Sequence, residues 1–228
     1  MRNITISILA ALLPSLATAT GYELIFKEEE PGIEPYISRT MITERYLRID
    51  DLSDDSGYVL YDDDTSTVYS ISHHNESILV IERDGFDRPA LSDKLKTSDK
   101  ALTDAPRIAG KQVNDYRVEL EDENLQEMCT HIQYVPGLLT EAGRMLHEYQ
   151  ITMAGNHVNS LENVPPEFRT PCMLSDQVYF DGAVYAKGLP IMEWRSNGRK
   201  KLLEDFSEKQ HDAAMFELPE GYRRFSLN

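Results

Sequence analysis

The chain of 228 residues has little cysteine, little basic charge and few long apolar segments. Its 23 Lys and Arg residues are outnumbered by 39 Asp and Glu residues, which gives a formal net charge of -16. Nucleic acids and anionic lipid surfaces both attract clustered Lys and Arg, so this charge argues against either partner. Beyond the first twenty or so residues, no apolar run approaches the roughly 20 residues needed to cross a bilayer. We therefore predict that the protein is not an integral membrane protein.

Catalytic and metal-binding motifs are also missing. The serines lack the Gly-x-Ser-x-Gly pattern of a nucleophile elbow, and the histidines show no i, i+4 pairing for a metal site. The acidic run from Asp50 to Asp64 does not match a calcium loop: counted from Asp51, Gly57 falls one residue late and the twelfth residue is Asp62 rather than Glu. We interpret this run as solvated hairpin turns, and we predict no catalytic residue, no metal and no cofactor.

Residues 1–19 have the composition of a secretory signal peptide. Arg2 precedes an apolar run from Ile4 to Leu16, and Ala17-Thr18-Ala19 fits the small-x-small rule for signal peptidase. We expect cleavage near Ala19 and a mature protein that is periplasmic or secreted. Residues 20–228 are expected to form one domain.

Only two cysteines are present, Cys129 and Cys172. In an oxidising compartment, an even number of cysteines indicates a disulfide. The pair is not a C-x-x-C motif, and no cluster of His, Lys or Arg lies beside either residue to lower the pKa of its thiol. We therefore predict a structural bond, which would constrain the unfolded chain by roughly 3 to 4 kcal/mol.

Apolar and polar residues alternate with period two over residues 22–82. The alternating segments are short, rich in Val, Ile, Tyr and Thr, and separated by turn-forming residues at 50–57 and 61–67. This pattern predicts an antiparallel meander. Near the other end of the chain, Asn197-Gly198 separates two strand-like runs and predicts a hairpin.

The middle of the chain has a different pattern. Residues 90–102 are polar and fit a short helix or a loop, and a strand follows around Tyr116. Residues 125–134 fit either a helix or the return strand of a hairpin, and periodicity does not decide between them. Apolar residues recur on one helical face from Pro136 to about Gly155, which predicts the main helix. Residues 175–188 suggest a second helix.

An antiparallel sheet that is interrupted by a helical insertion, at about residues 136–187, indicates a mainly β (α+β) fold. We expect a curved sheet, or open half-barrel, wrapped around one or two helices. Aromatic, aliphatic and methionine side chains are candidates to line an apolar binding cavity, because Met adapts its shape to irregular ligands. The candidates are Tyr58, Leu60, Tyr69, Tyr116, Val118, Met145, Tyr149, Met192 and Trp194. Ordinary core packing of the same residues is the alternative, since both arrangements follow the same period.

Two segments near the C-terminus resemble proteins with the LolA-like fold. The segment Phe216–Tyr222 (FELPEGY) resembles their closing F-x-L/I-P-x-G-Y segment, and Gly188–Ile191 (GLPI) resembles the turn that returns the chain from helices to sheet. Residues 41–82 are similar to their opening meander, whereas Lys111 stands where an aromatic residue is usual. The family comprises periplasmic carriers of outer-membrane lipoproteins and relatives of unknown function. The resemblance therefore implies the same fold and a carrier without enzymatic activity.

These observations predict a periplasmic, non-enzymatic binding or carrier protein for an apolar ligand, such as a lipid, an acyl chain or a lipidated protein. One alternative is an accessory envelope protein that uses the same fold for protein–protein contacts, and a third is a hydrolase with paired carboxylates in a cleft. A cavity of about 300 to 1,000 Å³ would favour the carrier. A filled interior together with an exposed apolar patch would favour the accessory protein.

Overall fold

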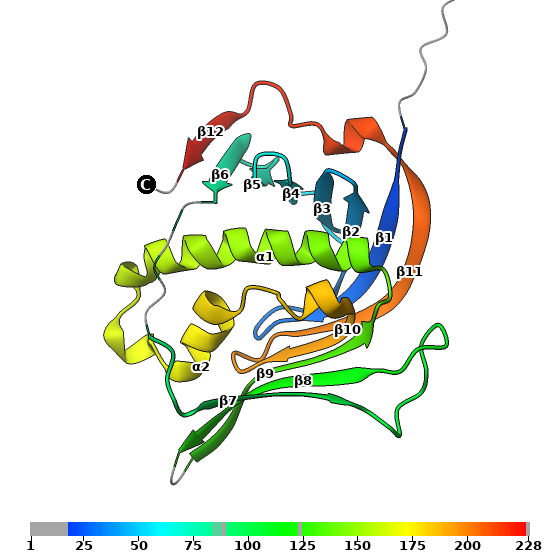
Figure 1. Ribbon diagram of the computed structural model, residues 1–228. Coiled ribbons are helices and arrows are strands. Elements are labelled where there is room, and N and C mark those ends of the chain that lie inside the picture. Colours follow the sequence, from blue (N-terminus) through cyan, green and yellow to red (C-terminus); the bar gives the residue numbers. More distant parts are fainter. Residues whose placement is uncertain (1–17, 84, 86, 88–89, 123–124, 227–228) are drawn as a thin grey trace, which may run out of the picture.

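The computed structural model describes residues 18–83, 85, 87, 90–122 and 125–226. Within these ranges, twelve strands form one open sheet that curves around a long helix (Figure 1). This architecture confirms the mainly β fold class with a curved sheet wrapped around helix. The order of strands across the sheet is β12-β6-β5-β4-β3-β2-β1-β11-β10-β9-β8-β7.

Neighbouring strands are antiparallel except for β12, which pairs with β6 in parallel. The expected meander corresponds to the first six strands, and Asn197-Gly198 lies in the hairpin between β10 and β11, with Gly198 at φ +88°. The strands are β1 (Thr18–Glu29), β2 (Tyr36–Thr43), β3 (Tyr46–Asp51), β4 (Gly57–Asp62), β5 (Thr67–Ser72), β6 (Ser77–Glu82), β7 (Leu95–Ala101), β8 (Asn114–Asp122), β9 (Leu125–Pro136), β10 (Gly188–Arg195), β11 (Lys200–Asp212) and β12 (Arg223–Ser226).

The prediction of a short helix or loop at residues 90–102 is wrong, because Leu95–Ala101 form β7 at the edge of the sheet. Among the described strands, it pairs only with β8, and most of its side chains are exposed, so it lacks the alternation that marks a half-buried strand. The open question over residues 125–134 is resolved in favour of a strand. Here β9 lies between β8 and β10 and pairs with both.

The main helix, α1 (Thr140–Ser160), begins four residues after the expected start at Pro136 and extends beyond Gly155. The delay has a local cause: Gly137 and Leu139 have φ values of +65° and +45°, which a right-handed helix does not allow.

The predicted second helix is broken into short pieces, because Phe180 is extended and Gly182 turns the chain at φ +75°. The short helical segments are η1 (Leu161–Asn163), η2 (Pro166–Phe168), α2 (Pro171–Leu174), the π-helical η3 (Ser175–Tyr179), η4 (Tyr185–Lys187) and η5 (Ala213–Phe216).

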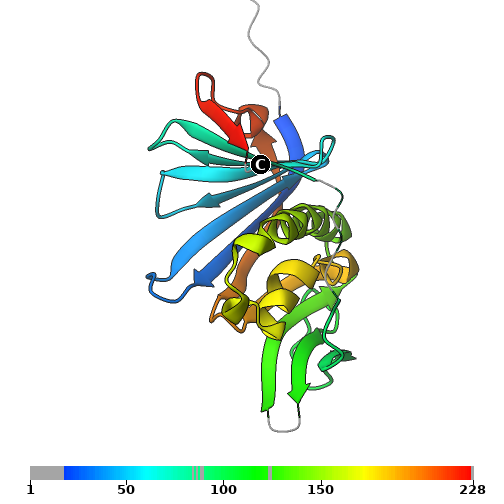
Figure 2. The ribbon, with the colours of Figure 1, turned by 90° about the vertical axis from the view of Figure 1, so that its left-hand side faces the viewer.

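Both faces of the sheet carry a core. On the concave face, Met145 of α1 is fully buried in one cluster with Leu24, Tyr61 and Leu189 of the sheet. On the opposite, convex face, Phe216 lies in a second cluster over β2, β4, β5 and β6. The segment that contains Phe216 runs from the end of β11 across the meander to β12 (Figures 1 and 2).

A disulfide joins Cys129 of β9 to Cys172 of α2, two residues that are 43 positions apart and have Cα atoms 4.7 Å apart. The predicted pairing is therefore confirmed, and such bonds persist in oxidising compartments. Among the described residues, no helix is both long and apolar enough to cross a membrane. Most of the predicted signal peptide, residues 1–17, lies outside the described residues. Thr18 and Ala19 begin β1 and pair with Asp212 and His211.

Candidate functional site

A cleft of about 660 Å³ opens on the concave face beside α1. One side is formed by the adjacent ends of β1 to β5, β10 and β11, and the other by α1 and the segment that contains η3 and η4. In an antiparallel sheet, the C-terminal end of one strand lies beside the N-terminal end of the next. These strand ends therefore meet at the same edge of the sheet. Figure 1 shows α1 lying lengthwise inside the curve of the sheet.

The cleft floor has an apolar band and a polar band, which follow from strand alternation. Side chains two positions apart on a strand point to the same face. Phe26 on β1 shares the concave face with Leu24 and packs in the core under α1, and Glu28 comes two residues later on the same face. Each band therefore contains side chains from several different strands.

We define the apolar band as Phe26, Ile49 and Val59 of the sheet with Leu146 and Tyr149 of α1. All five border the cleft, and all belong to the concave core cluster or pack against it. The apolar band thus extends the core of the molecule into the cleft.

The polar band lies nearer the strand ends, and its first centre is Glu28, which is only 7% exposed. The hydroxyls of Ser38 and Tyr36 donate to its carboxylate, and Lys201 Nζ lies 3.1 Å from Glu28 Oε1. The Lys201 ammonium is also 4.3 Å from the centre of the Phe26 ring. Burial raises the pKa of Glu28, but Lys201 and Ser38 outweigh this effect, so the pKa lies below its usual range.

The second centre of the polar band is Arg195, whose guanidinium lies 3.8 Å from the centre of the Phe180 ring. Arg195 donates to Glu193 at 3.2 Å and to the Thr130 hydroxyl at 3.3 Å. Glu193 also accepts a hydrogen bond of 2.6 Å from the buried Tyr185 hydroxyl. These contacts join β9, β10 and the helical segment at the cleft.

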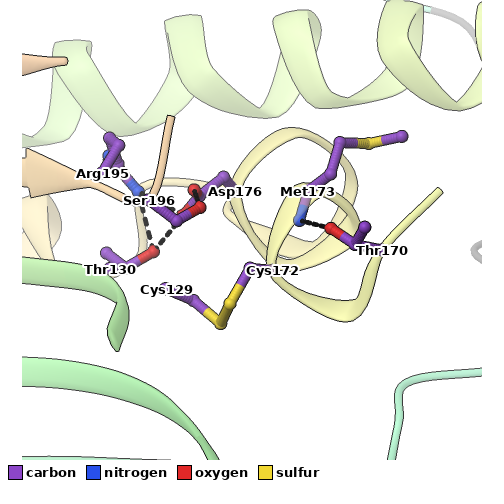
Figure 3. The surroundings of a disulfide bond; sticks show 8 residues. All are labelled: Cys129, Thr130, Thr170, Cys172, Met173, Asp176, Arg195 and Ser196. Carbon is purple, nitrogen blue, oxygen red and sulfur yellow. Dashed lines mark hydrogen bonds and ion pairs between the residues drawn. A yellow bond between two sulfur atoms is a disulfide. The ribbon is translucent and has the colours of Figure 1, made fainter. Parts of the chain in front are cut away.

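Asp176 of η3 completes this centre, as Figure 3 shows. Its carboxylate lies 3.7 Å from Arg195 and accepts hydrogen bonds from the hydroxyls of Thr130 and Ser196. Burial raises the pKa of Asp176, and its hydrogen bonds and Arg195 offset only part of that rise. The disulfide lies close to this group and ties the same helical segment to β9 (Figure 3).

The cations that line the cleft are all ion-paired. Lys201 pairs with Glu28, Arg195 with Glu193 and Asp176, Arg199 with Glu30, and Lys200 with Glu29. The cleft thus offers many hydrogen-bond donors and acceptors but no excess of positive charge.

The nine predicted lining residues do not form one wall. Tyr116, Val118, Met145 and Tyr149 are on the concave side. Tyr58, Leu60 and Tyr69 pack on the convex face under the C-terminal segment. Met192 and Trp194 also face the convex side, because they alternate with Glu193, which contacts Tyr185 on the concave side. Of the nine, Tyr58 and Tyr149 border the cleft.

The interpretation of the acidic run as solvated turns is wrong for Asp50 and Asp62, which are both 7% exposed. Asp50 accepts hydrogen bonds from Arg39 and Arg48, and Asp62 accepts them from Arg45. The antiparallel pairing of β2, β3 and β4 brings these side chains together. In the part of the chain that the structure describes, no group of three or more His, Cys, Asp or Glu residues is arranged to hold a metal ion.

Sequence reasoning missed the polar band. Its partners are far apart in the chain, as with Glu28 and Lys201, so no local motif marks it. The available signal was the change from apolar to charged residues along one face of a strand, from Leu24 and Phe26 to Glu28.

The chain matches no family model and no curated protein sequence. Among solved structures, it is similar to an uncharacterized conserved protein from Thermus thermophilus, with 8% identity, a TM-score of 0.42, and coverage of 92% of this chain and 91% of that one. PNGF-II in one crystal form gives 10% identity and a TM-score of 0.40, with 92% of this chain and 31% of that chain covered. PNGF-II in a second crystal form gives 10% identity and a TM-score of 0.41, with 92% of this chain and 32% of that chain covered. The chain therefore spans about a third of the length of PNGF-II.

Proposed function

We propose that this is a non-enzymatic binding or carrier protein that holds a ligand with an apolar part in the concave cleft. The ligand class is a lipid, an acyl chain or a lipidated protein segment. The observation that supports the proposal is the cleft itself. Its volume of about 660 Å³ is within the range of roughly 300 to 1,000 Å³ that is usual for small-molecule sites, and its floor contains the apolar band.

Apolar burial supplies the binding free energy in this proposal. Each methylene removed from water contributes about 0.8 kcal/mol, so six methylenes against the apolar band would contribute roughly 5 kcal/mol before ordering costs. An open cleft also suits a carrier, because the ligand enters and leaves without unfolding of the core.

The proposed location is the periplasm or the extracellular space. The disulfide supports an oxidising compartment, and the signal-peptide pattern of residues 1–19 supports export. The resemblance of Phe216–Tyr222 to the LolA-like fold agrees with a carrier of lipidated cargo.

The first test is extraction of protein purified without detergent from a periplasmic fraction, followed by mass spectrometry of the extract. We expect a lipid or acylated molecule near one per chain. The delipidated protein should bind the apolar probe N-phenyl-1-naphthylamine saturably. Val59→Asn, in the apolar band, should weaken this binding about tenfold, whereas Leu202→Asn, on the convex face, should leave it unchanged.

A second candidate function, an accessory protein with an envelope partner, is favoured by one observation. Leu202 is 50% exposed on the convex face and pairs across strands with Met192, beside Trp194. Clean extracts together with no saturable uptake of the probe would contradict the carrier and favour this candidate.

A further inference from the structure

The polar band forms a continuous row across four strands of the cleft. Register pairs Glu193 with Lys201, Lys201 with Glu28, and Glu28 with Tyr36. Four adjacent strands span about 14 Å, and on β1, the strand that carries residues of both bands, Phe26 lies two residues, or about 7 Å, from Glu28. An amphiphile can therefore place its apolar part against α1 and its head group on the row.

Both cations of the polar band are already ion-paired. Glu28, Glu193 and Asp176 supply three carboxylates against the two cations Lys201 and Arg195. An anionic head group would meet this excess of carboxylate, and it could gain a cation only by separating that cation from its partner. Separation of a largely buried pair leaves an uncompensated charge, which is strongly unfavourable.

A neutral hydroxyl avoids both penalties. It can donate to a carboxylate oxygen and also accept from an ammonium or guanidinium group that keeps its ion pair. Lys201 and Arg195 have three and five N–H donors, so donors remain after the contacts to Glu28, Glu193 and Thr130. The row thus suits a group with several hydroxyls.

We infer that the cleft selects amphiphiles with an uncharged, hydroxyl-rich head group over amphiphiles with an anionic one. This inference rests on the proposed function, because it names the head-group class of the ligand bound in the same cleft. The apolar band supplies affinity, and the paired charges of the polar band supply selectivity.

The test compares two probes that share a twelve-carbon chain and differ in the head group. Binding of dodecyl maltoside and of dodecanoate to the full delipidated protein is measured by calorimetry at pH 7, below the concentrations at which either probe forms micelles. We expect dodecyl maltoside to bind at least tenfold more tightly than dodecanoate.

A charge-altering variant sharpens the test. Glu28→Gln releases Lys201 from its ion pair, so dodecanoate should bind about tenfold more tightly and the preference for the maltoside should shrink. Glu23→Gln is the matched control. Glu23 pairs with Lys209 between the same two strands but alternates with Leu24, on the opposite face from the cleft. If Glu28→Gln does not fold, Glu193→Gln removes one of the two carboxylates paired with Arg195 and should shift the preference in the same direction.

The outcomes separate this inference from the proposed function. If dodecanoate binds the unaltered protein as tightly as dodecyl maltoside, the head-group inference is overturned while the carrier proposal stands. The head-group inference is overturned in the same way if Glu28→Gln and Glu23→Gln shift the preference equally. If neither probe binds, both proposals are contradicted.

Discussion

Two carboxylates, the buried Asp115 and the more exposed Asp99, illustrate how residues from distant parts of the chain stabilise one another. Asp115 of β8 is only 6% exposed and accepts bonds of 2.5 Å from both His131 Nε2 and Arg117 Nε. Asp99 of β7 accepts from Lys187 at 2.7 Å and from the Tyr134 hydroxyl at 3.0 Å. For both carboxylates, burial raises the pKa, but these partners outweigh it and hold the pKa below its usual range.

This lowering of pKa predicts acid sensitivity. Unfolded Asp has a pKa near 3.9, so the unfolded chain binds more protons than the folded one as the pH falls below about 5. The stability that these pairs contribute is therefore present at neutral pH and is lost as the pH falls through the lowered folded pKa values. Urea unfolding between pH 7 and pH 2.5 should show a steep loss of stability below about pH 4. Asp115→Asn should be less stable at pH 7 and should show a shallower slope.

Asp104→Asn is the control for this experiment, because Asp104 is an exposed carboxylate in the loop after β7. It should leave both the stability and the acid slope unchanged. Equal slopes in the Asp115 variant and the unaltered protein would show that the pair with His131 and Arg117 does not stabilise the fold.

Among the elements, the short segment of α2 and η3 depends most on links to the sheet. Cys172 and Cys129 share a small cluster with Val118 and Leu120, and Asp176 adds its bonds to β9 and to the residue after β10. A four-residue helix cannot hold its position by its own hydrogen bonds, because helix formation needs a longer run. The disulfide therefore fixes one side of the cleft.

Replacement of both cysteines by alanine should lower the free energy of unfolding by roughly 4 kcal/mol, as the chain-entropy model gives for a loop of this length. The change is measured by urea unfolding at pH 7. Reduction of the unaltered protein under the same conditions should give a similar loss, which controls for packing changes at Cys129 and Cys172. A loss below about 1 kcal/mol in both experiments would show that the bond does not constrain the unfolded chain.

Elements were predictable from sequence where one face of a strand is buried. Each of the strands β1 to β6 buries at least one face and is bounded by turn-forming residues, and Asn197-Gly198 marks the hairpin by its turn geometry alone. The edge strand β7 is mostly exposed, and the segment from Ser175 to Lys187 breaks where Phe180 is extended and Gly182 has a positive φ. The pattern also does not say which face of the sheet a strand's apolar residues meet, so it does not separate Tyr69 and Trp194, which face the convex side, from Tyr149, which borders the cleft.

At the scale of the whole molecule, the curved sheet needs a cover on each face. The concave face is covered by α1 (Figure 1), and the cleft opens beside this helix. The convex face of the meander is covered by the C-terminal segment, from η5 to β12 (Figure 2). The two covers lie on opposite faces, and no residue of the convex cover lines the cleft, although Tyr58, which packs beneath this cover, borders the cleft at the start of β4.

Phe216 anchors the convex cover. It is 5% exposed, stacks on Tyr46 with ring centres 5.7 Å apart, and packs in one cluster with Met41 and Leu60. Truncation of a buried Phe leaves a cavity and typically costs about 3 to 5 kcal/mol, and we expect Phe216→Ala to lose stability within this range in urea unfolding.

Phe225→Ala provides the matched control, because Phe225 belongs to the same segment but is 44% exposed. It should lose less than about 1 kcal/mol, since little apolar surface is returned to water. In both variants, the affinity for N-phenyl-1-naphthylamine should be unchanged in the absence of urea, because the cleft lies on the other face of the sheet. Equal stability losses in the two variants, or loss of probe binding in a Phe216→Ala protein that is still folded, would contradict this separation of the two faces.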